Sequence, residues 1–86
     1  MPEISRFFGI RILMYYADHL PPHFHARYPG YRVSIEIESL AVLAGDLPGR
    51  ALGLVVEWGR LHRSELLDDW KRARDTQPLL PIDPLD

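Results

Sequence analysis

The fold of this chain is decided by one stretch, His23-Phe24-His25-Ala26-Arg27-Tyr28-Pro29-Gly30-Tyr31-Arg32-Val33-Ser34-Ile35-Glu36. Pro followed by Gly suits the two central positions of a type II turn, and the runs on either side are rich in β-branched and aromatic residues. The pattern therefore predicts an antiparallel hairpin around Pro29-Gly30, with Tyr28 facing Tyr31.

The two faces of this hairpin are predicted to differ in character. Side chains alternate between the faces of a strand, so every second residue lies on the same side. The apolar face then carries Phe24 and Ala26 opposite Ile35 and Val33. The polar face carries His23, His25 and Arg27 opposite Glu36, Ser34 and Arg32.

The segments on either side of the hairpin extend the prediction to the whole chain. The β-branched and aromatic run 7–16 indicates a first strand, and 40–44 is either a further short strand or the lead into a helix. From about residue 47 to 74 the apolar residues recur at helical spacing, with a break near Gly59 as an alternative to one long helix. That stripe consists of Ala51, Leu54, Val55, Trp58, Leu61, His62, Leu66, Trp70 and Ala73.

These elements predict an α+β domain with three or four antiparallel strands, followed by one long or two shorter helices that cover the sheet. We expect residues 1–76 to form this single domain. Residues 77–86 contain three prolines and are expected to be a non-helical tail. The apolar residues of the tail either dock on the domain or bind a partner.

Composition narrows the class of protein. The chain has 86 residues, of which 47% are hydrophobic and 26% charged, as in a small globular domain. The absence of cysteine excludes a disulfide scaffold, a thiol nucleophile and a zinc-thiolate site. A net charge of -2 excludes a general attraction to nucleic acid, so any basic site is local.

Location and assembly are also predicted from composition. No apolar run reaches the length of about 18 residues that a spanning helix needs, and the N-terminus lacks the layout of a signal peptide. We therefore expect a cytoplasmic protein with no membrane contact. A core this small also favours burial of further area, against a partner or in a homo-oligomer.

The polar face of the hairpin, with the loop before it, predicts a metal site. His-x-His on a strand places two imidazoles on one face, about 6.5 to 7 Å apart at the backbone, from which both rings can reach one ion. The candidate ligands are Asp18, His19, His23 and His25. Such a set suits a divalent transition metal, with zinc, iron(II), nickel and manganese left open.

Two other interpretations use the same residues. In a metal-free site, His23 or His25 acts as general acid or base, while Arg27 and Arg32 bind a phosphate and stabilise developing negative charge. Cleavage of RNA suits this set because the 2′-hydroxyl supplies the nucleophile. Alternatively, the polar face is an ordinary solvated surface on which the histidines bond to Glu36 and Ser34 and the arginines pair with acidic neighbours.

His62 is a further catalytic candidate, with a conflict attached. It lies on the apolar stripe beside Trp58 and Leu66, where a lone histidine is usually a core residue. If the helix covers the Phe24 face, His62 is on the wrong side of the sheet to meet His23. A register shift in the hairpin or a second helix that wraps the sheet would remove the conflict.

The motif Asp18-His19-x-Pro21-Pro22-His23-Phe24-His25 resembles a bacterial family of unknown function, DUF4160. The resemblance extends to Pro2-Glu3-Ile4-Ser5-Arg6-Phe7-Phe8-Gly9, Gly45-Asp46-Leu47-Pro48, and Glu57-Trp58 with Leu61-His62-Arg63-x-Glu65-Leu66. It implies a small cytosolic protein encoded beside a second small protein, an arrangement similar to toxin-antitoxin pairs. It also implies His19, His23, His25 and His62 as candidates for one shared site, with no established reaction.

Two functions from different classes follow. The first is a toxin-like enzyme of such a pair that acts on RNA or a nucleotide through His23 and His25, with Arg27 and Arg32 on the phosphate. The second is a non-catalytic binding module, antitoxin-like or stabilised by a metal, that binds the cognate small protein. In that case the apolar tail from Leu79 to Leu85 docks the partner or a second copy.

Overall fold

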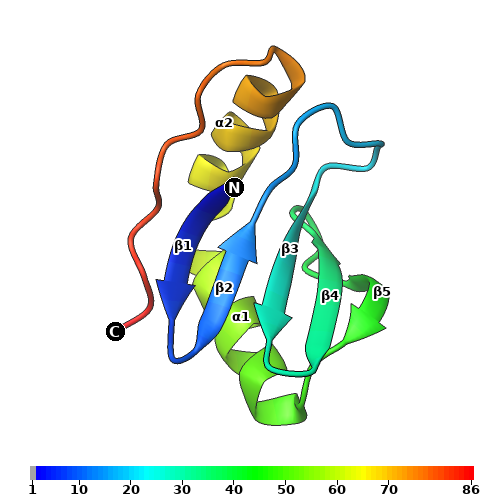
Figure 1. Ribbon diagram of the computed structural model, residues 1–86, viewed down its shortest axis with the longest axis vertical. Helices are drawn as coiled ribbons and strands as arrows, with labels where there is room; N and C mark the ends of the chain where they lie inside the picture. The colour runs from blue at the N-terminus through cyan, green and yellow to red at the C-terminus, as the bar shows by residue number, and fades with distance from the viewer. Residues whose placement is uncertain (1) are drawn as a thin grey trace.

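A computed structural model describes residues 2–86 and contains a five-stranded antiparallel sheet followed by two helices. The α+β class is confirmed, with five strands where three or four were expected. The strands follow each other in chain order across the sheet, as Figure 1 shows. The elements are β1 (Glu3–Phe7), β2 (Ile10–Leu13), β3 (His23–Tyr28), β4 (Tyr31–Glu36), β5 (Val42–Asp46), α1 (Gly49–Leu61) and α2 (Arg63–Arg74).

The central hairpin has the predicted register. Tyr28 is opposite Tyr31 and His25 is opposite Ser34 in the β3–β4 pair. Gly30 has a φ of 82°, which a type II turn requires of its third residue. Strict alternation from this turn divides the side chains of the two strands between the faces as expected.

The expected first strand, 7–16, corresponds to β2 and to the last residue of β1. The rest of β1 lies before the predicted segment, and this missed strand corrects the strand count. Phe8 and Gly9 both have positive φ, 51° and 79°, and they join β1 to β2 in a tight turn. Positive φ at both central residues is the signature of a type I′ hairpin turn. The sequence prediction missed this turn because Phe8 is an unusual residue at such a position, although Gly9 is a common one.

The helical region is two helices, and the break lies at His62 rather than at Gly59. His62 has φ −120° and ψ 25°, and separates α1 from α2. Gly59 instead brings α1 close to the sheet, because a Cβ there would meet the Leu40 side chain at 2.8 Å. Leu61, predicted to be on the apolar stripe, is 65% exposed, because α1 ends at this residue.

The core lies between α1 and one face of the sheet. The fully buried Trp58 packs its ring against Phe7 at 5.5 Å and Phe24 at 5.8 Å between ring centres. α1 lies behind the sheet in Figure 1, and α2 continues past the upper end of the strands. Within residues 2–86, the opposite face of the sheet, called the open face, is therefore free of helices except at that upper end, where Trp70 of α2 contacts His23.

The tail docks on its own domain, which is one of the two outcomes the sequence left open. It runs beside β1 (Figure 1), where the backbone N–H of Ile82 donates to the carbonyl oxygen of Ile4 at 2.7 Å. Trp58 Nε1 donates to the carbonyl oxygen of Asp83 at 2.8 Å, and the side chain of Ile82 is buried. Within residues 2–86, no helix has both the length and the apolar character that crossing a membrane requires.

Candidate functional site

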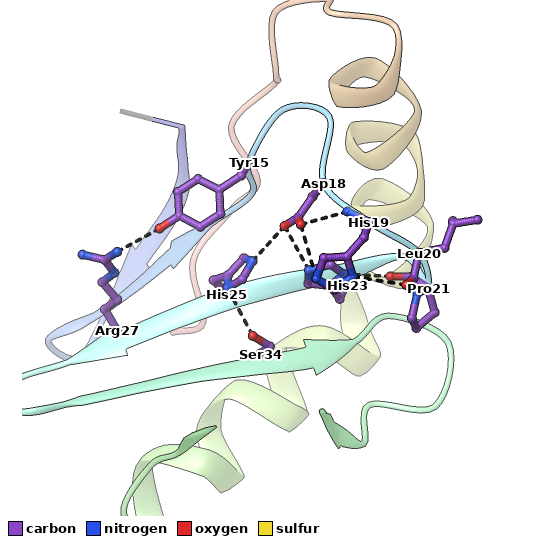
Figure 2. Close-up of polar contacts among 9 residues, drawn as sticks. All are labelled: Tyr15, Asp18, His19, Leu20, Pro21, His23, His25, Arg27 and Ser34. Atoms are coloured by element: carbon purple, nitrogen blue, oxygen red, sulfur yellow. Dashed lines mark hydrogen bonds and ion pairs between the residues drawn. The ribbon is translucent and has the colours of Figure 1, made fainter. Parts of the chain in front are cut away.

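Asp18 lies between two histidines at the upper end of the open face. Its Oδ2 atom is 3.0 Å from His23 Nε2 and 3.1 Å from His25 Nε2. Figure 2 shows the carboxylate directed at both imidazoles. His23 and His25 share this face of β3 because they are two residues apart in a strand, so alternation places their rings side by side, 5.0 Å between centres.

The loop between β2 and β3 brings Asp18 to the strand. The backbone N–H of His19 donates to Asp18 Oδ1 at 2.9 Å, which leaves Oδ2 directed at the histidines. The backbone N–H of Ile37 donates to the Pro22 carbonyl at 3.0 Å and ties the end of the loop to the segment after β4. The carboxylate is therefore held by backbone contacts on the side away from the rings.

The second nitrogen of each ring has its own partner. His23 Nδ1 is 2.7 Å from the carbonyl oxygen of Pro21, which can only accept, so the ring hydrogen is on Nδ1. His25 Nδ1 is 3.3 Å from Ser34 Oγ. His23 Nε2 is therefore a lone pair in the neutral ring, and it faces another acceptor, Asp18 Oδ2. A cation between these two atoms, either a proton or a metal ion, makes the contact favourable.

The site changes the proton affinity of two of its groups. Burial raises the pKa of Asp18, but the hydrogen bonds from His25 and the His19 backbone, and the charges of the histidines, together hold that pKa below its ordinary value. Burial lowers the pKa of His25, and the neighbouring His23 and Arg27 lower it further, against the opposing effect of Asp18. Both directions favour an ionised carboxylate beside a neutral imidazole, the forms that bind metal ions.

Asp18, His23 and His25 each offer one ligand atom, and these atoms lie within 4.8 Å of one another. Two imidazoles and a carboxylate suit zinc, iron(II), nickel or manganese. Metal-binding histidines usually donate their other ring hydrogen to a fixed acceptor, which orients the ring. Pro21 supplies such an acceptor to His23, and Ser34 occupies the corresponding position beside His25.

Two predicted site histidines lie outside this group of three. The ring of His19 stacks on His23 at 5.0 Å, but its side chain is 80% exposed and its Nε2 is 3.7 Å from Asp18. His62 packs against Trp58 at the helix break, and its Nδ1 is 2.6 Å from Glu65. The sequence left open whether His62 could reach His23. In the structure α2 brings Trp70, and not His62, to His23.

A basic pocket adjoins His25 on the same face. It has a volume of about 280 Å³, and its lining includes Tyr15, His25, Arg27 and Arg32. Arg27 Nη2 donates to the Tyr15 hydroxyl at 2.9 Å, and the Tyr15 ring meets the His25 ring edge-on at 4.7 Å (Figure 2). The two arginines predicted to bind phosphate therefore do lie together beside one of the candidate ligands.

Gly45 shapes the edge of this pocket. Its φ is 74°, and a Cβ there would meet the backbone oxygen of Arg32 at 2.2 Å. Only glycine therefore permits β5 to approach β4 at this point.

Sequence reasoning missed Tyr15 and underestimated Trp70. Residues 11, 13 and 15 alternate with Ile10, Ile12 and Met14 of the core, and pairing of β2 with β3 places them on the face of His25. The alternation could thus have predicted Tyr15 once the order of the strands was known. Trp70 was predicted only to be part of the apolar stripe, and it is buried, but its ring also covers His23 at 5.3 Å.

Comparison with known proteins agrees with the sequence resemblance. A family model described as a domain of unknown function, DUF4160, matches residues 9–71, which include Asp18, both ligand histidines and both pocket arginines. No curated protein and no solved structure matches the chain. Since the matched segment covers well over half of its length, the chain belongs to the DUF4160 family.

Proposed function

We propose that the protein is a divalent-metal-dependent hydrolase that acts on the phosphate esters of RNA or of a nucleotide. The observation that carries the proposal is the position of His23. Its Nδ1 hydrogen is donated to Pro21, and its Nε2 lone pair converges with His25 Nε2 on Asp18 Oδ2. The ionised carboxylate of Asp18 and the lone pair of His23, with His25 Nε2 beside them, form a site for a cation.

The same contacts favour metal chemistry over metal-free acid and base catalysis. Each histidine has Asp18 on one ring nitrogen and a second protein group, Pro21 or Ser34, near the other. A general base must instead offer a nitrogen to the substrate within about 3 Å. The imidazoles are thus better arranged to bind an ion than to exchange a proton with a substrate in the pocket.

The basic pocket supports a phosphate ester as the substrate. When bound, a divalent ion would activate a water molecule and polarise a phosphoryl oxygen. Arg27 and Arg32 would bind the remaining phosphoryl oxygens and stabilise charge in the transition state. In the reaction the water oxygen bonds to phosphorus, the ester P–O bond breaks, and the proton that the water releases goes to the leaving oxygen.

Metal titration tests the first half of this proposal. Chelator-treated protein is titrated with zinc, manganese(II), nickel(II) and iron(II), followed by calorimetry and by tryptophan fluorescence. We expect one ion per chain and a change in fluorescence, because Trp70 is 5.3 Å from His23. Trp70→Phe should lose the fluorescence change and keep the heat of binding.

Hydrolysis tests the second half. The metal-loaded protein is assayed on bis-para-nitrophenyl phosphate and on single-stranded RNA, beside Asp18→Asn, His25→Ala and the matched control His19→Ala. We expect the first two variants to lose metal and activity and the control to retain both, since His19 lies outside the converging group. Equal metal binding by all three variants would contradict the site, and a loaded but inert protein would contradict the reaction.

Within a cell, this activity would make the protein the toxin-like member of a pair with a small partner protein. Overexpression in a bacterial host should then arrest growth, and the arrest should disappear with His23→Ala or His25→Ala. Circular dichroism of the purified variants checks that they fold. Continued arrest by folded variants would contradict this role.

A second candidate, a non-catalytic binding module, is favoured by β5. This edge strand is exposed along its whole length, with Val42 and Leu43 44% and 43% exposed. An exposed strand edge can pair with a strand of another chain. Sedimentation velocity, of the protein alone and mixed with the small protein encoded beside it, measures this association. Loss of the association in Val42→Lys would support a binding role for β5.

A further inference from the structure

A second pocket adjoins the candidate metal site, between the loop that precedes β3 and the C-terminal half of α2. Its volume is about 140 Å³, and we call it the loop pocket. Its lining residues are Tyr15, Asp18, Leu20, Trp70, Ala73 and Arg74. The proposed hydrolysis uses only Asp18 among them.

The loop pocket and the basic pocket lie on either side of the pair formed by Asp18 and His25. Asp18 lines the loop pocket, His25 lines the basic pocket, and the two side chains are 3.1 Å apart. Tyr15 lines both pockets, and Figure 2 shows Tyr15 and Asp18 on either side of the His25 ring. A substrate with its phosphate beside Arg27 can therefore place its organic group in the loop pocket.

The wall of the loop pocket is apolar and its volume is small. Trp70 and Ala73 are buried and form the helical side of the wall, while Leu20 is 75% exposed. A ligand that covers Leu20 would remove apolar surface from water, which favours binding. Sites for drug-sized ligands have volumes of about 300–1,000 Å³. The loop pocket is therefore suited to one flat ring and not to a longer chain of groups.

Arg74 gives the loop pocket one polar group. Its ion pair with Asp75, at 3.6 Å, is weak because both side chains are more than half exposed. A guanidinium can only donate, and arginine commonly recognises the carbonyl oxygens and ring nitrogens on the edges of nucleobases. A plain phenyl ring has no such acceptor. Arg74 therefore favours a nucleobase over a hydrocarbon ring as the occupant.

We infer that the substrate is a mononucleotide whose base enters the loop pocket, and that Leu20 and Arg74 determine its specificity. The inference rests on the proposed function and names its substrate class. The phosphate would lie beside Asp18 and Arg27, and the base would contact Leu20 and accept a hydrogen bond from Arg74. One base pocket and one phosphate pocket beside a single metal site match the two ends of one nucleotide.

Binding measured without cleavage tests this inference separately from hydrolysis. Wild-type protein in excess chelator is titrated by nuclear magnetic resonance with uridine monophosphate, ribose 5-phosphate, phenyl phosphate and a strand of five uridines. We expect uridine monophosphate to bind at least about tenfold more tightly than ribose 5-phosphate, which lacks the base. The indole N–H signal of Trp70, one of two tryptophans in the chain, should shift with uridine monophosphate and not with ribose 5-phosphate.

Matched variants locate the base. Leu20→Ala should weaken binding of uridine monophosphate about fivefold and leave ribose 5-phosphate unaffected. Leu61→Ala, which shortens an exposed leucine at the end of α1, should change neither. Arg74→Gln should weaken uridine monophosphate about fivefold and leave phenyl phosphate unaffected, and Arg60→Gln on α1 is its control.

Three outcomes would overturn the inference. They are equal affinity for uridine monophosphate and ribose 5-phosphate, equal weakening by Leu20→Ala and Leu61→Ala, and binding of the uridine strand tenfold more tightly than the mononucleotide. If the base binds in the loop pocket but the metal-loaded protein cleaves no ester, the proposed hydrolysis fails and this inference stands. If the chromogenic ester is cleaved but the base adds no affinity, the reverse holds.

Discussion

Asp18 and Asp69 are two aspartates withdrawn from solvent, and their surroundings are opposite in kind. Asp69 is fully buried, and its Oδ1 accepts hydrogen bonds from Arg72 and from the backbone N–H of Leu80, both at 2.9 Å. Its charge is thus met by a permanent cation and by the tail. Asp18 faces two imidazoles, whose charge depends on a bound proton or metal ion.

The difference shows how one small domain separates stability from function. A carboxylate with a fixed cation and a backbone donor joins two segments of the chain, here α2 and the tail at Leu80. A carboxylate beside imidazoles has no permanent cation, and a bound proton or metal ion has to supply the positive charge. We therefore expect Asp69 to control folding and Asp18 to control binding.

The largest effect is expected from Asp69→Ala. The substitution leaves Arg72 and the Leu80 N–H without their acceptor, so the free energy of unfolding should fall by about 3 kcal/mol. Urea denaturation in excess chelator measures this, with the exposed neighbour Asp68→Ala as control. Equal stability of the two variants would remove the structural role of Asp69. Metal affinity of the folded Asp69→Ala protein should match the wild type.

Asp18→Asn should show the converse pattern. Loss of the only charged ligand should lower metal affinity by at least about 100-fold, which is near 2.7 kcal/mol. In chelator the free energy of unfolding should change by less than about 1 kcal/mol, because the asparagine amide can donate to His23 Nε2, which a carboxylate cannot do. Competition with a chelating dye and urea denaturation measure the two quantities. A large loss of metal-free stability would make Asp18 a second structural carboxylate.

Ser34→Ala tests the contact that supports the His25 ring on the side away from Asp18. Ser34 lies 3.3 Å from His25 Nδ1 and helps to orient the ring. Removal of a group that orients a metal ligand costs about tenfold or more in affinity. The same dye competition measures this, with Ser39→Ala, in the turn before β5, expected to be unchanged. Identical affinities for both variants would show that His25 needs no help from Ser34.

The smallest effect is expected at Glu3, a carboxylate at the surface. Hydrogen bonds from Arg6 and Arg11 lower its pKa below the ordinary value. Its contribution to stability is therefore present above the unfolded pKa of about 4.3 and is lost as the pH falls through the lower folded value. Glu3→Gln should destabilise the protein by about 0.5 kcal/mol at pH 7. Denaturation at several pH values should show this difference shrink as the pH falls and vanish once Glu3 is protonated in the folded protein. A constant difference would exclude the ion pairs as its cause.

Much of the fold followed from local pattern. The β3–β4 register came from Pro29-Gly30 and a period of two, and β4 and β5 then extend the sheet. The β1–β2 turn was missed because Phe8 adopts positive φ, which its side chain disfavours and the packing of the hairpin imposes. The helix break was predicted near Gly59 but lies at His62. Gly59 is inside α1, where the absence of a side chain leaves room for Leu40.

The candidate site also combines relations that local pattern predicts with relations that only the tertiary structure shows. Alternation alone put His25 and Arg27 on one face, and β4 added Arg32, because these relations span only a few residues. Sequence also named Asp18, but its place between two imidazoles depends on the path of the loop over β3. His62 lies apart from Asp18, His23 and His25 because α1 ends at Leu61 and the helix break places His62 beside Trp58 and Glu65.

By itself, then, the sequence determined the α+β class, the central hairpin and the side of the sheet that carries the polar residues. These properties follow from periodicity and turn chemistry, which act between near neighbours along the chain. Only the tertiary structure decided which side chains converge, that Trp70 covers His23, and that the tail is held by Asp69. Those contacts join residues far apart in sequence, and they depend on the packing of the whole domain, which no local pattern encodes.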